Sequence, residues 1–204
     1  MTIKLDLKGG KIVDITIVLG AIAGLLQLVA FVIYNKQIIH GTSQPNVATW
    51  TLWAYLTVLN VSSYAVMSND WVKCILPAVS SAACLATFFF AAYKGKLSKL
   101  ETWDSAALLI GIFAGFVWWY FSSAKYTNLI LQGAAAISFA PTLRGVWKDP
   151  LKERALPWYI WSFAYVLNLI VISMRWRNQY EDLVYPVNCL ILHAAVGLFA
   201  RRKV

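Results

Sequence analysis

Long apolar stretches, separated by short polar and charged segments, recur along nearly the whole chain. Each stretch is about 17 to 23 residues long, and a helix of that length, rising about 1.5 Å per residue, crosses a hydrocarbon core about 30 Å thick. The pattern therefore predicts an all-α integral membrane protein with seven transmembrane helices. The predicted spans are Val13–Tyr34, Ala48–Ser68, Val72–Tyr93, Trp103–Phe121, Tyr126–Leu143, Trp158–Met174 and Leu183–Ala200.

One part of this pattern occurs twice. The segments WTLWAYLTVLN (50–60) and WYIWSFAYVLN (158–168) share five of eleven residues at an offset of 108. A fixed offset of this kind is the sequence signature of an internal repeat. The same offset pairs Phe31 with Phe139 and Lys36 with Arg144, and a one-residue shift pairs Pro77 with Pro186. We infer that a unit of three helices is repeated.

The repeat predicts a layout of three helices, one helix and three helices. A unit with three crossings ends on the opposite side of the membrane from its start, so a second copy in the same orientation needs one extra crossing. The fourth span has no counterpart elsewhere in the chain and is expected to be this linker. We predict an N-terminal repeat over 1–94, a linker helix over 95–125 and a C-terminal repeat over 126–204. The two repeats would form two parallel three-helix bundles.

The composition supports a membrane protein. Hydrophobic residues make up 60% of the chain and charged residues 13%, which is more apolar surface than a soluble core of this size could bury. The net charge of +9 does not indicate nucleic acid, because the lysines and arginines lie in loops, where the positive-inside rule explains them. Eleven fall on one side and seven on the other. This bias predicts a cytoplasmic C-terminus and an N-terminus outside, in a plasma or inner membrane.

The first span and the three cysteines are expected to be structural. Asp6 and Asp14 dilute the basic lead-in and no small-residue cleavage site follows the span, so we expect it to remain as a helix. Cys74, Cys84 and Cys189 form no C-x-x-C pair and lie in or beside apolar spans. We interpret them as packing residues and predict neither a disulfide framework nor a metal site.

The repeated tryptophans and asparagines are the main candidates for substrate binding. Asn60 and Asn168 lie ten residues into their segments, about 15 Å of helical rise, which places both near the bilayer midplane. Each asparagine follows a tryptophan, Trp53 or Trp161, by seven residues, about two turns, so the two side chains share a helix face. Indole rings stack on other rings, and a carboxamide both donates and accepts hydrogen bonds. These groups suit a neutral, hydroxyl-rich solute.

Structural interpretations compete with these assignments. Trp50 and Trp158, at the helix starts, are most simply an aromatic belt at the membrane interface, with gating as the alternative. An asparagine inside a membrane helix can also bond to a neighbouring helix. The remaining polar candidates within the spans are Gln27, Gln132, Asn188 and His193.

Catalytic chemistry is not indicated. The chain has no Gly-x-x-x-x-Gly-Lys-Ser/Thr loop, no His-Glu-x-x-His and no carboxylate in the middle of a span. We therefore expect no enzyme activity, no metal and no cofactor. With no buried acid expected, proton coupling would rest on His193 alone, so facilitated diffusion is the simpler mechanism.

The three-one-three layout and two local segments resemble the SWEET and PQ-loop transporter superfamily. The segments are SFAPTLRGVWKDPLKERALPWYIW (138–161) and YPVNCLILHAAVGLFARRK (185–203). Pro141-Thr142 stands where that family has a Pro-Gln or Pro-Thr pair, and Pro186-x-Asn188 is similar to its Pro-Asn element. The paired tryptophans followed by asparagine look like the nicotinamide riboside permease branch of the same fold. The resemblance implies repeats related by an axis along the membrane normal, a substrate contact from Asn188 and a hinge at Pro141.

The leading hypothesis is a facilitator, or uniporter, that carries a small neutral polar solute such as a sugar by alternating access around a midplane site. A nucleoside-like vitamin precursor is the alternative substrate. A second class is a non-transporting receptor or scaffold, because a fold does not fix a function. In that case the basic loop 144–157 would bind an acidic partner or anionic lipid. The expected partners are a small-molecule substrate and the lipid bilayer, and a homo-oligomer is left open.

Overall fold

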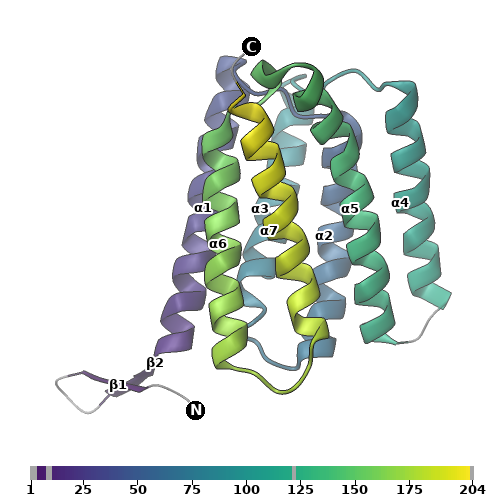
Figure 1. Ribbon diagram of the computed structural model, residues 1–204. Coiled ribbons are helices and arrows are strands. Elements are labelled where there is room, and N and C mark those ends of the chain that lie inside the picture. The colour runs from purple at the N-terminus through teal and green to yellow at the C-terminus, as the bar shows by residue number, and fades with distance from the viewer. Residues whose placement is uncertain (1–3, 8–10, 121–122, 203–204) are drawn as a thin grey trace.

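Seven long α-helices form most of the computed structural model, which describes residues 4–7, 11–120 and 123–202 (Figure 1). Their order and bounds are α1 (Ile15–His40), α2 (Val47–Ser68), α3 (Ile75–Tyr93), α4 (Thr102–Tyr120), α5 (Ala124–Lys148), α6 (Ala155–Met174) and α7 (Glu181–Ala200). A short 3-10 helix, η1 (Pro150–Lys152), lies between α5 and α6. Each predicted span overlaps one of these α-helices.

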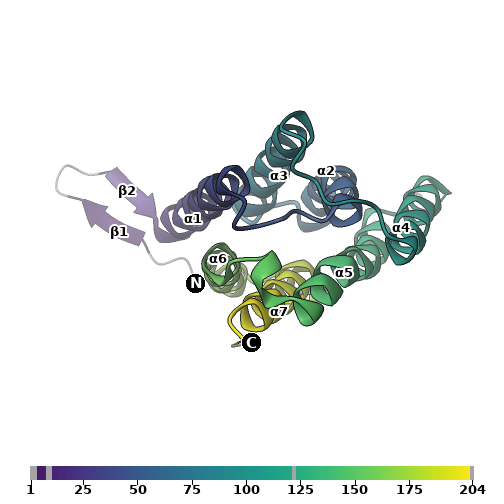
Figure 2. The same ribbon diagram turned by 90° about the horizontal axis from the view of Figure 1, so that it is seen from above.

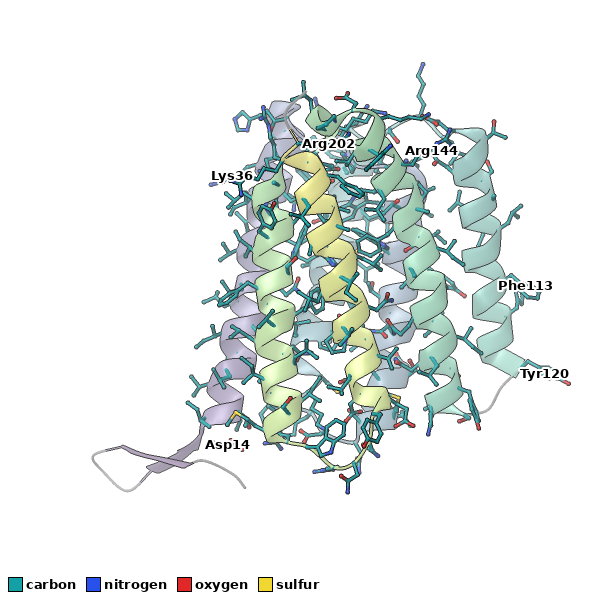
Figure 3. The ribbon with its side chains drawn as sticks, in the orientation of Figure 1. Asp14, Lys36, Phe113, Tyr120, Arg144 and Arg202 are labelled. Atoms are coloured by element: carbon teal, nitrogen blue, oxygen red, sulfur yellow. The ribbon has the colours of Figure 1, made fainter. Side chains whose placement is uncertain are left out.

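Five of the described helices, α1, α3, α5, α6 and α7, are long and apolar enough to cross a membrane. The helical body is therefore compatible with an integral membrane protein. α2 has a suitable length, but Asn60, Ser62 and Ser63 make its middle more polar. The outside of the body is apolar at many positions: Leu25 and Phe163 are more than half exposed. Figure 3 shows Phe113 of α4 pointing away from the other helices.

A two-stranded hairpin precedes α1 and lies outside the helical body (Figure 1). β1 (Lys4–Leu7) pairs antiparallel with β2 (Lys11–Asp14). The apolar pattern of the sequence does not predict these strands. Asp14 then becomes the N-cap of α1, because its carboxylate accepts a hydrogen bond from the Thr16 backbone N–H at 2.9 Å. This satisfies one of the free amides of the first turn.

Local caps set the ends of the helices that flank the first loop. α1 continues to His40, past the predicted end at Tyr34, and stops at Gly41, whose φ of +68° favours glycine. The Asn46 side chain accepts a hydrogen bond from the Thr49 N–H at 3.0 Å and starts α2. α5 also runs past its predicted end and contains Pro141 within the helix.

The helices stand in two rows (Figure 2). α1, α3 and α2 form one row, and α6, α7 and α5 form the other. The rows meet where α1 packs against α6 and where α2 packs against α5, and α4 packs against α5 and α2. We call the end of the body next to β1 and β2 the N-terminal face. The opposite end, where α1 and α7 finish, is the C-terminal face (Figure 1).

Candidate functional site

A cavity of about 60 Å³ lies between the two rows of helices. Its walls are mostly apolar, and none of the described residues that line it is Lys, Arg, Asp or Glu. A buried water needs roughly 10–15 Å³ of such space, so a few waters fit. A molecule the size of a sugar would require the cavity to widen.

Matching positions of the two predicted repeats line this cavity. Ten lining residues form five pairs at the offset seen in the sequence, 108 for the first three pairs and 109 for the other two. The pairs are Phe31 with Phe139, Trp53 with Trp161, Thr57 with Tyr165, Ser80 with Cys189, and Cys84 with His193. The echo in the sequence thus corresponds to one shared space in the structure, to which each row contributes.

The two repeated tryptophans in the wall differ in their hydrogen bonding. The Trp53 indole Nε1 donates to the Ser138 hydroxyl at 2.8 Å, and this bond links α2 to α5. The Trp161 Nε1 is buried and has no partner in the described part of the chain. A buried donor without a partner carries a desolvation cost of roughly 1–3 kcal/mol. Trp161 therefore has unused capacity to bind an acceptor.

A cluster of amides lies at the α2–α5 side of the cavity. The Asn60 Oδ1 accepts hydrogen bonds from the Asn128 Nδ2 at 3.0 Å and the Gln132 Nε2 at 2.7 Å. Asn60 and Gln132 line the cavity. The Gln132 Oε1 is buried and has no partner among the described residues. Among the described residues that line the cavity, Trp161 thus has a buried donor and Gln132 a buried acceptor without partners.

His193 lies at the centre of an aromatic cage. Its ring centroid is 5.0 Å from that of Phe139 and 5.2 Å from that of Tyr165, and three tryptophan rings lie within 6.0 Å. The Nδ1 atom is 2.7 Å from the Cys189 carbonyl oxygen. A carbonyl only accepts, so this contact assigns the proton to Nδ1 and leaves Nε2 as an acceptor.

Trp50 and Trp158 do not form an aromatic belt, so that interpretation of the sequence is wrong. Their exposed fractions are 1% and 0%. Tyr34 stacks on Trp50 at 5.1 Å between ring centroids and makes an edge contact with Trp158 at 6.0 Å. Both tryptophans lie in the first turn of their helices, at the C-terminal face, and pack inwards: Trp50 contacts the Trp53 ring and Trp158 contacts the Trp161 ring.

The other predicted site residues lie outside the cavity wall. Asn168 is buried, and neither its Oδ1 nor its Nδ2 has a partner in the described part of the chain. Asn188 donates through Nδ2 to the Gln132 carbonyl oxygen at 2.9 Å, a contact between α7 and α5. Pro141 lines a second, more polar pocket of about 330 Å³ at the C-terminal face, which we call the vestibule.

A buried acid lies between the vestibule and the aromatic cluster. Glu153, at the end of η1, is 2% exposed. Its carboxylate accepts a hydrogen bond from the Tyr34 hydroxyl at 2.8 Å and a longer one from the Trp158 Nε1 at 3.4 Å. Burial raises its pKa to about 8. The expectation of no buried acid is therefore wrong: Glu153 is in the basic loop, outside every predicted span.

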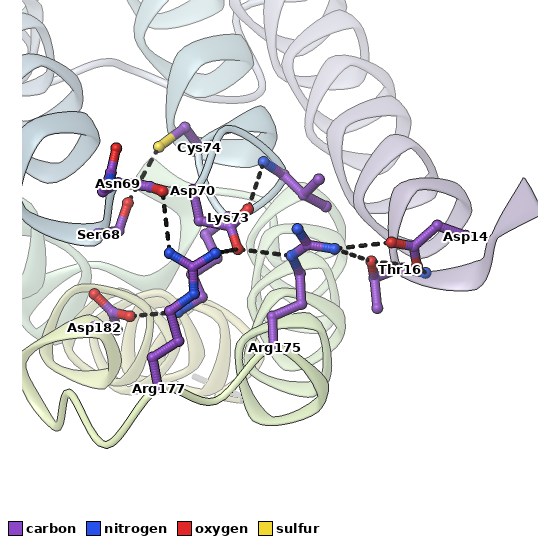
Figure 4. Close-up of polar contacts among 11 residues, drawn as sticks. Asp14, Thr16, Ser68, Asn69, Asp70, Lys73, Cys74, Arg175, Arg177 and Asp182 are labelled. Atoms are coloured by element: carbon purple, nitrogen blue, oxygen red, sulfur yellow. Dashed lines mark hydrogen bonds and ion pairs between the residues drawn. The ribbon is translucent and has the colours of Figure 1, made fainter. Parts of the chain in front are cut away.

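Ion pairs join the two rows at the N-terminal face (Figure 4). Lys73, just before α3, and Asp182 of α7 are both fully buried, and their Nζ and Oδ2 atoms are 2.6 Å apart. Arg175, at the end of α6, bonds to Asp70 at 2.8 Å and to Asp14 at 2.9 Å. Contacts between the two rows thus lie at both faces of the helical body.

The described residues include no group of three or more His, Cys, Asp or Glu side chains that could hold a metal ion. Comparison with family models, with curated proteins and with solved structures finds no match to this chain.

Proposed function

We propose that this chain is a membrane facilitator that carries a small neutral polar solute down its gradient, by alternating access around the central cavity. The observation that carries the proposal is the cavity itself: it lies between the two helix rows and is lined by matching positions from each. Solute sites of secondary transporters tend to lie at such repeat interfaces. In this proposal the rows are the two three-helix repeats and α4 is the linker.

The chemistry of the wall favours a neutral solute with hydroxyl groups. No formally charged side chain among the described lining residues would balance an ionic solute. The free donor on Trp161 and the free acceptor on Gln132 match a hydroxyl group, which accepts and donates at once. Aromatic faces would cover the apolar face of a sugar ring, our preferred substrate, or the base of a nucleoside-like molecule.

The contacts between the rows at the two faces would act as gates in an alternating cycle. Each contact joins one row to the other: Lys73 with Asp182 at the N-terminal face, and Tyr34 with Glu153 at the C-terminal face. Opening one face requires only its own contacts to break, while the other face stays sealed. We further propose that the C-terminal face is cytoplasmic, because the larger share of Lys and Arg lies on that side.

Uptake into liposomes tests this function. Purified protein is reconstituted, and the entry of labelled sugars and nucleosides is measured with and without an opposing gradient. We expect saturable flux that stops at equal concentrations on both sides. Asn60→Ala should reduce the flux at least tenfold, because it removes the acceptor that orients Gln132. Ser62→Ala, an exposed position on the same helix, is the matched control and should not change it.

Two results would contradict the proposal. One is the absence of flux for every solute of the panel by a correctly folded protein. The other is equal flux in the wild type and in Asn60→Ala. Absence of flux together with a stoichiometric protein partner held by the loop 144–157 would favour the receptor or scaffold.

A further inference from the structure

Glu153 is a buried carboxyl group that has no cationic partner among the residues the structure describes. It forms no ion pair with any described residue. Its two carboxylate oxygens instead accept from neutral donors, the Tyr34 hydroxyl and the Trp158 indole N–H. Of the four described acids that form ion pairs, three belong to the network at the N-terminal face: Asp14, Asp70 and Asp182. Neutral donors stabilise a buried carboxylate less than a charge does.

The position of Glu153 makes it a bridge between the two rows. Tyr34 belongs to α1 and Trp158 belongs to α6, which face each other across the row interface. The loops around them are also joined, since the Gln44 N–H donates to the Lys152 carbonyl at 2.8 Å. The C-terminal face therefore cannot open between α1 and α6 without exposing this carboxyl group.

Several charged residues line the vestibule together with Glu153, and the exposed Arg154 follows it in the chain. The charged residues that line the vestibule together with Glu153 are Lys99, Glu101, Asp104, Arg144, Lys148 and Lys152. From α1, the titratable group that faces it is Tyr34. At the end of α7, the Arg202 guanidinium bonds to the Trp147 carbonyl oxygen and stacks on the Trp147 ring. Burial raises the pKa of the carboxyl group, and hydrogen bonds from Tyr34, Trp158 and Ser43 oppose this rise.

The two protonation states favour different arrangements of this face. A neutral carboxylic acid tolerates burial, whereas an unpaired carboxylate is costly to keep away from water. With a pKa of about 8 in the closed arrangement, Glu153 carries its proton at neutral pH. Once the face opens and water reaches the group, its pKa returns towards about 4.3, the ordinary value for glutamate, and the proton leaves.

We propose that Glu153 is a proton-binding site that links opening of the C-terminal face to pH: the closed face holds the proton and the open face releases it. This rests on the proposed function only in treating the opening as a transport step. The closed arrangement binds one more proton than the open one between the two pKa values. The opening equilibrium therefore rises by up to tenfold per pH unit from about pH 4.3, and levels off above about pH 8.

Thiol labelling tests the link without any solute. Cys84 and Cys189 line the cavity, so their rate of reaction with a water-soluble maleimide reports cavity opening. Cys74, outside the cavity wall, is replaced by alanine in every variant. The rate is measured from pH 6 to pH 9 for the wild type background, for Glu153→Gln and for Glu101→Gln. Glu101 is an exposed carboxylate of the same vestibule and serves as the matched control.

The wild type rate divided by the Glu153→Gln rate cancels the pH dependence of the thiols themselves. We expect this ratio to rise at least tenfold from pH 6 to pH 8 and then level off, and Glu101→Gln to follow the wild type. A ratio that does not change with pH overturns the proposal. If Glu153→Gln does not fold, Tyr34→Phe replaces it. Loss of the Tyr34 donor should move the plateau of the labelling rate to higher pH. An unchanged pH profile of the labelling rate overturns the proposal. Labelling that follows pH in a protein without flux would contradict only the transport function.

Discussion

Trp53 and Trp161 occupy equivalent positions of the similar segments 50–60 and 158–168, but within the described part of the chain only the Trp53 indole N–H is hydrogen-bonded, to the Ser138 hydroxyl at 2.8 Å. Both rings line the cavity and both contact His193. Trp53 therefore links the two rows through its hydrogen bond, whereas the Trp161 N–H has no partner among the described residues. This difference separates a structural role for Trp53 from the proposed binding role of Trp161.

Replacing each tryptophan by phenylalanine should separate these roles. Trp161→Phe keeps an aromatic ring but removes the free donor, so half-saturation of solute flux should need about tenfold more solute, which corresponds to about 1.4 kcal/mol. Trp53→Phe leaves Ser138 without its donor and should lower the free energy of unfolding by about 1 kcal/mol. Flux assays and denaturant unfolding of both variants check this. The assignment fails if Trp161→Phe leaves the flux curve unchanged.

Glycine replacements test the packing of α7 on α6. A Cβ atom at Gly197 would lie 3.0 Å from the Tyr159 Cε1 and 3.3 Å from the Trp158 Cβ. Gly197→Ala should therefore force the helices apart and lower stability by about 1–3 kcal/mol. Gly133, in α5, has no atom within 4 Å of such a Cβ. Gly133→Ala should be neutral or stabilising by up to about 1 kcal/mol, and thermal unfolding in detergent compares the two.

The buried ion pair at the N-terminal face should be sensitive to loss of one partner. Lys73→Met leaves the Asp182 carboxylate buried without its cation, and such losses cost about 3–5 kcal/mol. The double variant Lys73→Met, Asp182→Leu removes both charges and should recover most of the stability. Chemical unfolding of the three proteins measures the effect. Equal stability of Lys73→Met and the wild type would show that the pair is not buried as described.

Stability should fall in acid at the start of α1. The Thr16 hydroxyl and backbone N–H, together with the Arg175 guanidinium, lower the pKa of the Asp14 carboxyl group. A lowered folded pKa means that this contribution is complete above the ordinary value of about 3.9 and is lost as pH falls through the folded value. The difference in melting temperature between the wild type and Asp14→Asn should therefore shrink below about pH 4.

The positions of the helices were predictable from the sequence because the length of an apolar run is a sufficient signal. Each run overlaps one helix, and the errors at the ends come from local caps, such as Gly41 after α1. The N-terminal hairpin has no comparable signal. The repeat was visible because Trp, Val, Leu and Asn recur at one offset.

The inward faces of the helices were less predictable. A helix that is apolar on all sides has little amphipathic pattern to show which side faces the protein, so Trp50 and Trp158 were assigned to the lipid interface. Asn60 and Asn168 look equivalent in sequence, but only Asn60 meets the amides of α5 and lines the cavity. Glu153 was missed because, among lysines and arginines, it looks like an ordinary solvated loop residue.

Three of the five matched pairs around the cavity carry different chemical groups. Thr57 is matched by Tyr165, Ser80 by Cys189 and Cys84 by His193. A perfectly symmetric cavity would bind a solute equally well in two orientations related by a half turn. The unlike pairs make the two orientations different, so a solute bound in the proposed site would take one preferred orientation relative to the two rows.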